Sequence, residues 1–431
     1  MKALLEKYCG ILFGNPYICL LVLLLAGAAA VWAAGMFSAS DSAVHRNMYV
    51  VLLMDNNVCV GALAGFVLYL VLLPLRRAEA AAVCILGCLL EAYLMSLRSG
   101  YITEAARAVY LHYVLFGLGL FGCSIAAVGL RLGQSVASGD TAASVRCWEV
   151  LGLMLALPAF YLLGICGGIK GGSGEVYDGF LLAADGLTGF QPSFVISAFV
   201  RRSSFFLVAM CFVYLYLPMW MALAQLASYK YEMKREEDCR RRLSGNIPAY
   251  AYLLAGIAGS LAYAYFPAVG TEVFCGASFP FGPVPDSLSR LYAAVFPAGY
   301  ERNAMPSLHL TWILCAFFSV YNFGFVYRSI WGVLVVLTLI SAFSVGCHWM
   351  TDFIAALPFT CMILGAACHR AHWRWRLAAV FFGGIGSFGL MYLLKNHIHV
   401  LLAHSALYFA AAVGTALLSL ALCVRLQRVA E

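Results

Sequence analysis

Two short polar stretches stand out in the apolar C-terminal half of the sequence. Residues 301–309 read Glu-Arg-Asn-Ala-Met-Pro-Ser-Leu-His, and residues 347–352 read Cys-His-Trp-Met-Thr-Asp. Each stretch leads directly into an apolar run, so each is predicted to lie at the start of a helix. Imidazole, carboxylate, hydroxyl and guanidinium groups in such a place can hold an anion and transfer a group from it.

The first stretch has the features of an anion-binding helix start. Ser307 is a preferred residue at a helix N-terminus, where unpaired amides and the positive end of the helix dipole attract phosphate. Arg302 adds a guanidinium that can bind phosphate with two hydrogen bonds, and Asn303 is a further candidate for substrate binding. His309 falls in the first helical turn, close to any anion held there.

The second stretch pairs a histidine with a carboxylate. His348 and Asp352 have the i, i+4 spacing that puts both on one face of a helix. A carboxylate placed there can fix the imidazole tautomer and stabilise its cationic form, which suits a nucleophilic or acid–base histidine. His309, His348 and Asp352 could instead ligate a divalent metal ion. The arginine and the helix N-terminus favour an anion, so we predict no metal and no cofactor.

The composition places this site in a membrane. Of 431 residues, 63% are apolar and 11% are charged, whereas about a quarter of the residues of a soluble protein are charged. Many apolar runs reach the roughly 20 residues that cross a bilayer, so the expected partners are the lipid bilayer and a membrane lipid substrate. The net charge of +7 lies mainly in loops beside these runs, where it sets topology and does not indicate nucleic acid binding.

We predict an all-α, polytopic helical bundle of about twelve spans, centred near residues 25, 66, 88, 120, 158, 215, 257, 316, 337, 359, 384 and 412. The densest basic segment, residues 230–242, follows the sixth span and is expected in the cytoplasm, which places both termini there. The eighth and ninth spans then bring the two polar stretches to the same outer face. The site is therefore expected on the periplasmic or luminal side.

The two stretches resemble signature motifs of the phosphatidic acid phosphatase type 2 superfamily. In that family a Pro-Ser-x-His motif is followed, one helical hairpin later, by His-x-x-x-Asp, matched here by residues 306–309 and 348–352. The resemblance covers roughly residues 185–368 and includes Phe266-Pro-Ala-Val-Gly270. The variant Asn-Ala-Met-Pro-Ser-Leu-His is similar to the inositolphosphotransferase-like branch related to inositol phosphorylceramide synthase.

The resemblance implies a role for each matching residue. His348 would attack phosphorus and form a phosphohistidine, and Asp352 would orient and stabilise its ring. His309 would protonate the leaving oxygen and then deprotonate the incoming alcohol or water. Ser307 would hold phosphoryl oxygens, whereas Arg302 is a candidate phosphate contact by its position alone.

Two family features are absent from this sequence. No copy of the upstream Lys-x6-Arg-Pro motif is found, and Ala342 stands where the third motif has arginine. Both absences fit the transferase branch better than a general phosphatase. Arg201 and Arg202 are candidates to supply the missing positive charge.

The sequence predicts three regions. They are a membrane domain of about five spans at 1–170, a catalytic domain at 171–370 with a six-helix lipid-phosphatase-like core, and two further spans at 371–431. In the first region Glu91 is an acid inside a predicted span, and such an acid is either functional or paired. Asp55, Arg98 and Arg107 are candidates to shape an acceptor pocket, with packing and topology as the alternative.

Three functions remain open at this point. The leading prediction is a lipid phosphotransferase that moves a phosphoryl headgroup from a lipid donor to an alcohol acceptor. The second is a lipid-phosphate or polyprenyl-phosphate phosphatase that uses water at the same site. The third is a proton-coupled lipid transporter or flippase, which is disfavoured because the sequence shows no internal repeat.

Overall fold

The structure is a computed structural model of the chain. It describes residues 56–73, 75–99, 117–168, 174–187, 189–235, 247–285, 294–296, 302–368 and 371–429. The chain forms two compact units, Met1–Leu162 and Leu163–Glu431. The predicted first span, as well as Asp55 and Arg107, lies outside the described residues.

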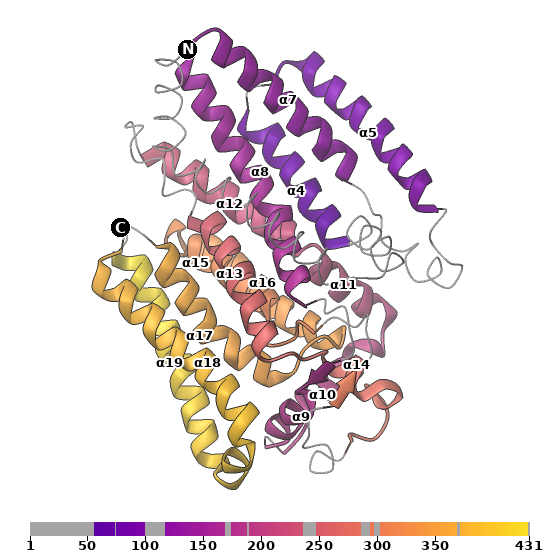
Figure 1. Ribbon diagram of the computed structural model, residues 1–431, viewed down its shortest axis with the longest axis vertical. Helices are drawn as coiled ribbons and strands as arrows, with labels where there is room; N and C mark the ends of the chain where they lie inside the picture. Colours follow the sequence, from indigo (N-terminus) through magenta and orange to yellow (C-terminus); the bar gives the residue numbers. More distant parts are fainter. Residues whose placement is uncertain are drawn as a thin grey trace. The chain divides into compact units, whose positions relative to one another are not determined.

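The first unit is built from apolar helices. Those that the structure describes are α4 (Asn56–Leu72), α5 (Arg77–Ser99), α7 (Leu118–Ala137) and most of α8 (Thr141–Gly168) (Figure 1). Helices α5 and α7 approach closely, because a Cβ atom at Gly87 would lie 2.8 Å from the Cα atom of Leu120. Glu91 of α5 is buried, and its Oε2 accepts the backbone N–H of Gly119 at 2.6 Å. This acid therefore stabilises the N-terminus of α7.

The described residues of the second unit form the α-helices that follow α8 and one short two-stranded ribbon. In chain order they are β1 (Gly174–Val176), α9 (Asp178–Gly186), α10 (Pro192–Arg201), α11 (Ser204–Leu215), α12 (Leu217–Arg235), α13 (Ile247–Tyr265), α14 (Thr271–Cys275), β2 (Ala294–Phe296), α15 (Leu308–Ser319), α16 (Phe325–Ser344), α17 (Met350–Ala367), α18 (Trp373–Ala403) and α19 (Ser405–Val429). Strands β1 and β2 pair antiparallel, with Glu175 opposite Val295.

The short elements of the second unit gather at one end of it. Figure 1 shows α9, α10, α14 and the ribbon together there. Aromatic contacts hold them: the ring of Phe194 meets Phe279 edge-on and the ring of Tyr177 packs on Phe266, both with centroids 5.1 Å apart. The same apolar cluster includes Met305 from the first polar stretch, so the predicted site rests on this core.

The predicted sixth span is broken. Helices α11 and α12 meet at Tyr216 and bend by 53°. A broken helix at membrane depth is tolerated where it is buried in protein or lines a cavity.

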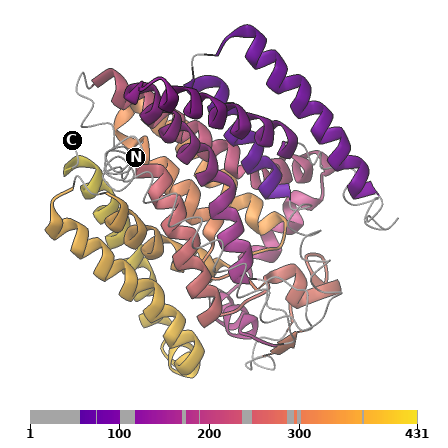
Figure 2. The ribbon, with the colours of Figure 1, turned by 45° about the horizontal axis from the view of Figure 1, so that its top comes forward.

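Small residues let α17 and α18 pack closely. A Cβ atom at Gly383 of α18 would lie 2.5 Å from the carbonyl oxygen of Pro358 and from the backbone nitrogen of Met362, both in α17. Ala379 and Gly383 form the small-xxx-small pattern that brings helix backbones together in membranes. Helices α17, α18 and α19 lie side by side in both views of the ribbon (Figure 1, Figure 2).

The all-α prediction is confirmed, and the chain carries several apolar helices, as a multi-pass membrane protein does. A helix lies at every predicted span centre that the structure describes. Among the described residues, six helices are long and apolar enough to cross a membrane, or up to seven if α11 and α12 form one bent span. The predicted count of about twelve is not confirmed. Helices α5 and α13 are not among the six, α4 and α15 are among the shorter apolar helices, and the first predicted span lies outside the described residues.

The close contact of α17 with α18 predicts opposite effects for two Gly→Ala variants in α18. Gly383→Ala should lower the thermal unfolding temperature, because the added methyl group would force the helices apart at a cost of about 1–3 kcal/mol. Gly389→Ala is the matched control: its nearest neighbour outside the helix backbone is 4.0 Å away, so it should be neutral or stabilise by up to about 1 kcal/mol. Equal stability of Gly383→Ala and the wild type would contradict this packing.

Candidate active site

Ser307 joins the first polar stretch to α15. Its backbone is extended, with φ −65° and ψ 106°, and its Oγ accepts the backbone N–H of Leu310 at 3.4 Å. Its carbonyl oxygen accepts from the N–H and the hydroxyl of Thr311 at 3.1 and 3.0 Å. Ser307 is therefore the N-cap of α15, and its hydroxyl stands at the positive end of the helix dipole.

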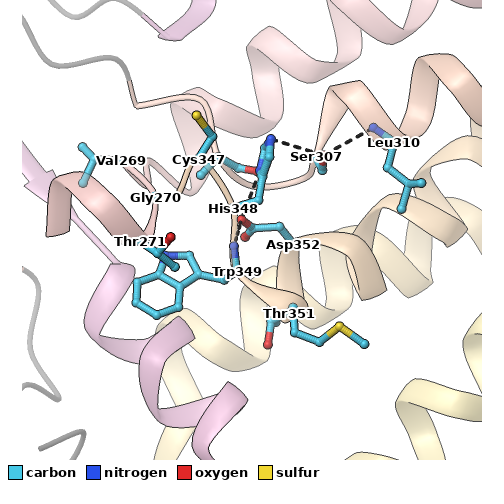
Figure 3. A network of polar contacts seen from close by, with 12 residues as sticks. Val269, Gly270, Thr271, Ser307, Leu310, Cys347, His348, Trp349, Thr351 and Asp352 are labelled. Carbon is cyan, nitrogen blue, oxygen red and sulfur yellow. Dashed lines mark hydrogen bonds and ion pairs between the residues drawn. The ribbon is translucent and has the colours of Figure 1, made fainter. Parts of the chain in front are cut away.

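The second stretch brings His348 against Ser307. The Nε2 atom of His348 lies 3.3 Å from Ser307 Oγ, and the Nδ1 atom lies 2.9 Å from the carbonyl oxygen of Ala304 and 3.3 Å from Asp352 Oδ2 (Figure 3). His348 is only 2% exposed. The structure thus joins residues on both polar stretches into one hydrogen-bonded group.

These contacts determine which ring nitrogen of His348 carries the proton. A backbone carbonyl only accepts hydrogen bonds, so Nδ1 must donate to Ala304. In the neutral imidazole Nε2 then has a free lone pair, which accepts the hydroxyl proton of Ser307. The lone pair points at the N-terminus of α15, which is the direction from which a bound phosphoryl group would meet it.

Asp352 contacts the His348 ring at Nδ1, which is not the nitrogen that faces Ser307. Besides its contact with His348 Nδ1, Oδ2 accepts the backbone N–H of Trp349 at 2.8 Å. This is the carboxylate half of a capping box, because Trp349 is the N-cap of α17 and Asp352 is the third helical residue. The same side chain therefore begins the helix and orients the imidazole. A fixed Nδ1–H and a nearby carboxylate would stabilise positive charge on the ring during reaction.

Burial sets the charge of His348. The ring lies in the loop before α17, and removal from water lowers its pKa to about 4, although the hydrogen bond to the Ala304 carbonyl acts in the opposite direction. Since the pKa is lowered, the ring takes up a proton only as the pH falls toward 4. His348 is therefore neutral at physiological pH, as a nitrogen nucleophile must be.

His309 lies beside this group on the first turn of α15. Its ring centroid is 5.9 Å from that of His348. The ring of Tyr214 stacks on His309 with a centroid distance of 3.9 Å and an interplanar angle of 16°. Tyr214 comes from α11, just before the bend at Tyr216, so the end of this helix places an aromatic ring against His309. Nothing in the local sequence near His309 indicated this partner.

A turn between α13 and α14 holds the two polar stretches together. The carbonyl oxygen of Ala268 accepts the backbone N–H of Ala304 at 3.0 Å. Gly270 has φ +88°, and a Cβ atom there would lie 2.4 Å from the carbonyl oxygen of Cys347. A side chain at Gly270 is excluded both by this approach and by the backbone conformation. The segment Phe266–Gly270, noted in the sequence only as part of a resemblance, thus contacts both halves of the site.

Two acids that the sequence analysis did not assign to the site also reach it. Asp178 and Asp185 of α9 accept hydrogen bonds from the segment that follows His348, at Trp349 and at Thr351. Asp185 also accepts from the backbone N–H of Met350. The first amides of α17 are therefore occupied, whereas the N-terminus of α15 lies beside the Nε2 atom of His348, where an anion would be attracted by the helix dipole.

Arg302 and Arg201 make contacts outside the group formed by Ser307, His348 and Asp352. Arg302 is 2% exposed, and its Nη2 donates to the carbonyl oxygen of Phe296 in the ribbon at 3.2 Å. Arg201 pairs with Glu272 and donates from Nε to the carbonyl oxygen of Ser344 at 3.0 Å. Arg201 thus stabilises the C-terminus of α16. Roles for Arg302 and Asn303 in substrate binding stay predictions, as does compensation by Arg201 or Arg202.

Three comparisons with known proteins bear on this site. Residues 179–366 match the PAP2 superfamily. The matched segment contains both polar stretches and the turn that joins them. The match is to the superfamily, so the resemblance to the inositol phosphorylceramide synthase branch stays a prediction. No curated protein and no solved structure matches the chain.

The geometry predicts a neutral His348 with its proton on Nδ1. In protein labelled with ¹⁵N at histidine, the signals lost in His348→Gln identify this ring among the nine histidines of the chain. Its Nε2 should show the shift of an unprotonated nitrogen and should not change between pH 8 and about 5.5, since the pKa of about 4 lies below that range. Protonation of the ring within that range would contradict the assignment.

Proposed function

We propose that this protein is a membrane phosphotransferase that acts on phosphoryl groups of lipids through His348. The observation that carries the proposal is the placement of His348: Nδ1 is held by Ala304 and Asp352, and Nε2 faces the N-terminus of α15. The match of residues 179–366 to the PAP2 superfamily supports the same chemistry. We further propose that both termini lie in the cytoplasm and that the site faces the periplasm or lumen, because the densest basic segment follows the sixth predicted span.

In the first step Nε2 of His348 attacks phosphorus. A bond forms between Nε2 and phosphorus, and the bond from phosphorus to the leaving oxygen breaks with its electron pair going to that oxygen. His309 donates a proton to the leaving oxygen. The phosphorylated imidazole keeps its proton on Nδ1, and the carboxylate of Asp352 stabilises the resulting positive charge. Ser307 and the amides of the first turn of α15 bind the phosphoryl oxygens.

In the second step an acceptor hydroxyl replaces His348. His309, now neutral, removes the proton from the acceptor oxygen while that oxygen attacks phosphorus. The bond between Nε2 and phosphorus breaks, and its electron pair returns to the ring. His348 and His309 thereby regain their starting protonation states. The phosphoryl headgroup has moved from one oxygen to another with no net change in protons.

The acceptor decides between two activities. We propose an alcohol acceptor, because Ala342 replaces the family arginine and the upstream basic motif is absent, as in the transferase branch. Water at the same position would give a lipid-phosphate or polyprenyl-phosphate phosphatase. With an alcohol as the acceptor, the donor is a phospholipid whose headgroup moves as a whole.

The mechanism predicts that His348→Ala abolishes binding of a transition-state analogue. Orthovanadate forms a five-coordinate adduct that resembles the transferring phosphoryl group, and such analogues bind far more tightly than substrates. Titration of the protein in lipid nanodiscs should give saturable vanadate binding that His348→Ala loses. His404→Ala, at an exposed histidine between α18 and α19, is the matched control and should bind as the wild type does. Undiminished binding of orthovanadate by folded His348→Ala would contradict the mechanism.

A second experiment identifies the acceptor. Nanodiscs containing ³²P-labelled phosphatidylinositol and either ceramide or a diacylglycerol whose acyl chains differ from those of the donor should yield a new labelled lipid if an alcohol is the acceptor. Nanodiscs containing ³²P-labelled phosphatidate or polyprenyl phosphate should yield little free phosphate. Rapid release of free phosphate without transfer to a lipid alcohol would replace the transferase proposal with a phosphatase.

A further inference from the structure

Helix α9 presents two buried acids to the segment that carries His348 and Asp352. Asp178 and Asp185 are 0% and 2% exposed. Their spacing, with one acid at each end of α9, places them on the same face of that helix. Neither acid has a part in the two chemical steps proposed above.

Asp178 links three separate parts of the site. Its Oδ1 accepts the backbone N–H of Gly270 at 2.9 Å and the indole N–H of Trp349 at 2.8 Å. Its Oδ2 accepts the backbone N–H of Val269 at 2.9 Å. One carboxylate therefore ties α9 to the turn after α13 and to the residue bonded directly to His348.

Asp185 holds the first turn of α17. Its Oδ2 accepts the backbone N–H of Met350 at 2.7 Å, and its Oδ1 accepts the N–H and the hydroxyl of Thr351 at 2.9 and 2.6 Å. Met350 and Thr351 lie between His348 and Asp352 in the chain. Asp178 and Asp185 thus contact every residue between the proposed nucleophile and its carboxylate partner.

The donor sets show that both acids act as carboxylates. These contacts come from N–H and O–H groups that donate to the acids. Burial raises the pKa of both side chains to about 6, and the hydrogen bonds act in the opposite direction, so both are ionised at neutral pH. Neutral Ser or Asn residues cap helices without the desolvation cost of a buried charge. The presence of two buried carboxylates here, despite that cost, indicates that the segment from His348 to Asp352 must be held firmly in place.

We propose that Asp178 and Asp185 are positioning residues that fix where His348 and Asp352 stand relative to Ser307. Asp178 acts through the indole of Trp349, and Asp185 acts through the amides of Met350 and Thr351. The inference rests on the proposed function of His348. An error of about 1 Å in the place of a reacting group can lower the rate about 100-fold, so loss of either carboxylate should weaken transition-state binding.

The direct test is vanadate binding by Asp178→Asn and Asp185→Asn in nanodiscs. Each substitution keeps the size of the side chain but turns an amide N–H₂ toward backbone donors. The dissociation constant for orthovanadate should rise about tenfold or more for each variant, measured per folded molecule. Glu175→Gln is the matched control, because Glu175 is an exposed acid on β1 whose Oε2 accepts the hydroxyl of Tyr177 at 3.4 Å. It should bind vanadate as the wild type does.

Milder variants keep the test decisive if the Asn variants do not fold. Trp349→Phe removes the indole donor to Asp178 together with part of a buried ring. Thr351→Val keeps the side-chain volume and removes the hydroxyl, which donates to Asp185 and lies 3.3 Å from the hydroxyl of Tyr408. Both should weaken vanadate binding severalfold, and Thr351→Ser should restore it because serine keeps the hydroxyl. A purely structural role for the acids would lower the unfolding temperature without this rescue in affinity.

The outcomes separate this inference from the proposed function. If wild type does not bind vanadate, or if folded His348→Ala binds it equally, the proposed function fails and this inference fails with it. If His348→Ala loses binding while folded Asp178→Asn and Asp185→Asn bind as wild type does, only the positioning role is overturned. Weakened binding in both Asn variants, normal binding in Glu175→Gln, and rescue by Thr351→Ser would establish it.

Discussion

The hydrogen bond from His348 Nδ1 to the carbonyl oxygen of Ala304, 2.9 Å long, is the interaction on which the site depends. Because a carbonyl cannot donate, this one contact places the ring proton on Nδ1 and leaves the lone pair on Nε2. It also crosses between the two polar stretches, so it forms only when both are in place. Rotation of the ring, or loss of either end, would remove the nitrogen that faces Ser307.

The rest of the second unit holds the two ends of that bond. Ala304 is tied to Ala268, and the loop before His348 packs on Gly270. The last two helices add support from outside the matched segment 179–366: Tyr408 of α19 lies 3.3 Å from the Thr351 hydroxyl, and Lys395 of α18 donates to the Tyr265 carbonyl oxygen at 2.9 Å. The geometry of the candidate site thus draws on α9, α13, α17, α18 and α19 together.

Sequence reasoning was sufficient where the physical cause is local. An N-cap at Ser307 is a property of neighbouring residues, and apolar runs show where helices lie. The contact between His348 and Asp352 is also found, but the expectation that both lie on one face of a helix was wrong: His348 lies in the loop before α17, and Asp352 reaches its ring from the third helical residue. The sequence was insufficient where hydrogen-bond partners are distant along the chain: Asp185 and Thr351 are 166 residues apart. Arg302 was predicted to contact phosphate because it precedes Ser307; the contact of its guanidinium with the ribbon was not foreseen, and its role in phosphate binding stays a prediction. Span counting failed to anticipate the bend between α11 and α12.

The central claim is that His348 becomes phosphorylated on Nε2. The most direct measurement is rapid quenching in base during turnover with a ³²P-labelled phospholipid, followed by mass spectrometry of the peptides, because a phosphohistidine survives base and is lost in acid. The account predicts a base-stable, acid-labile phosphoryl group on His348 that is absent from His348→Ala. A phosphoryl group on His309 instead, or turnover with no phosphorylated intermediate at any residue, would contradict it.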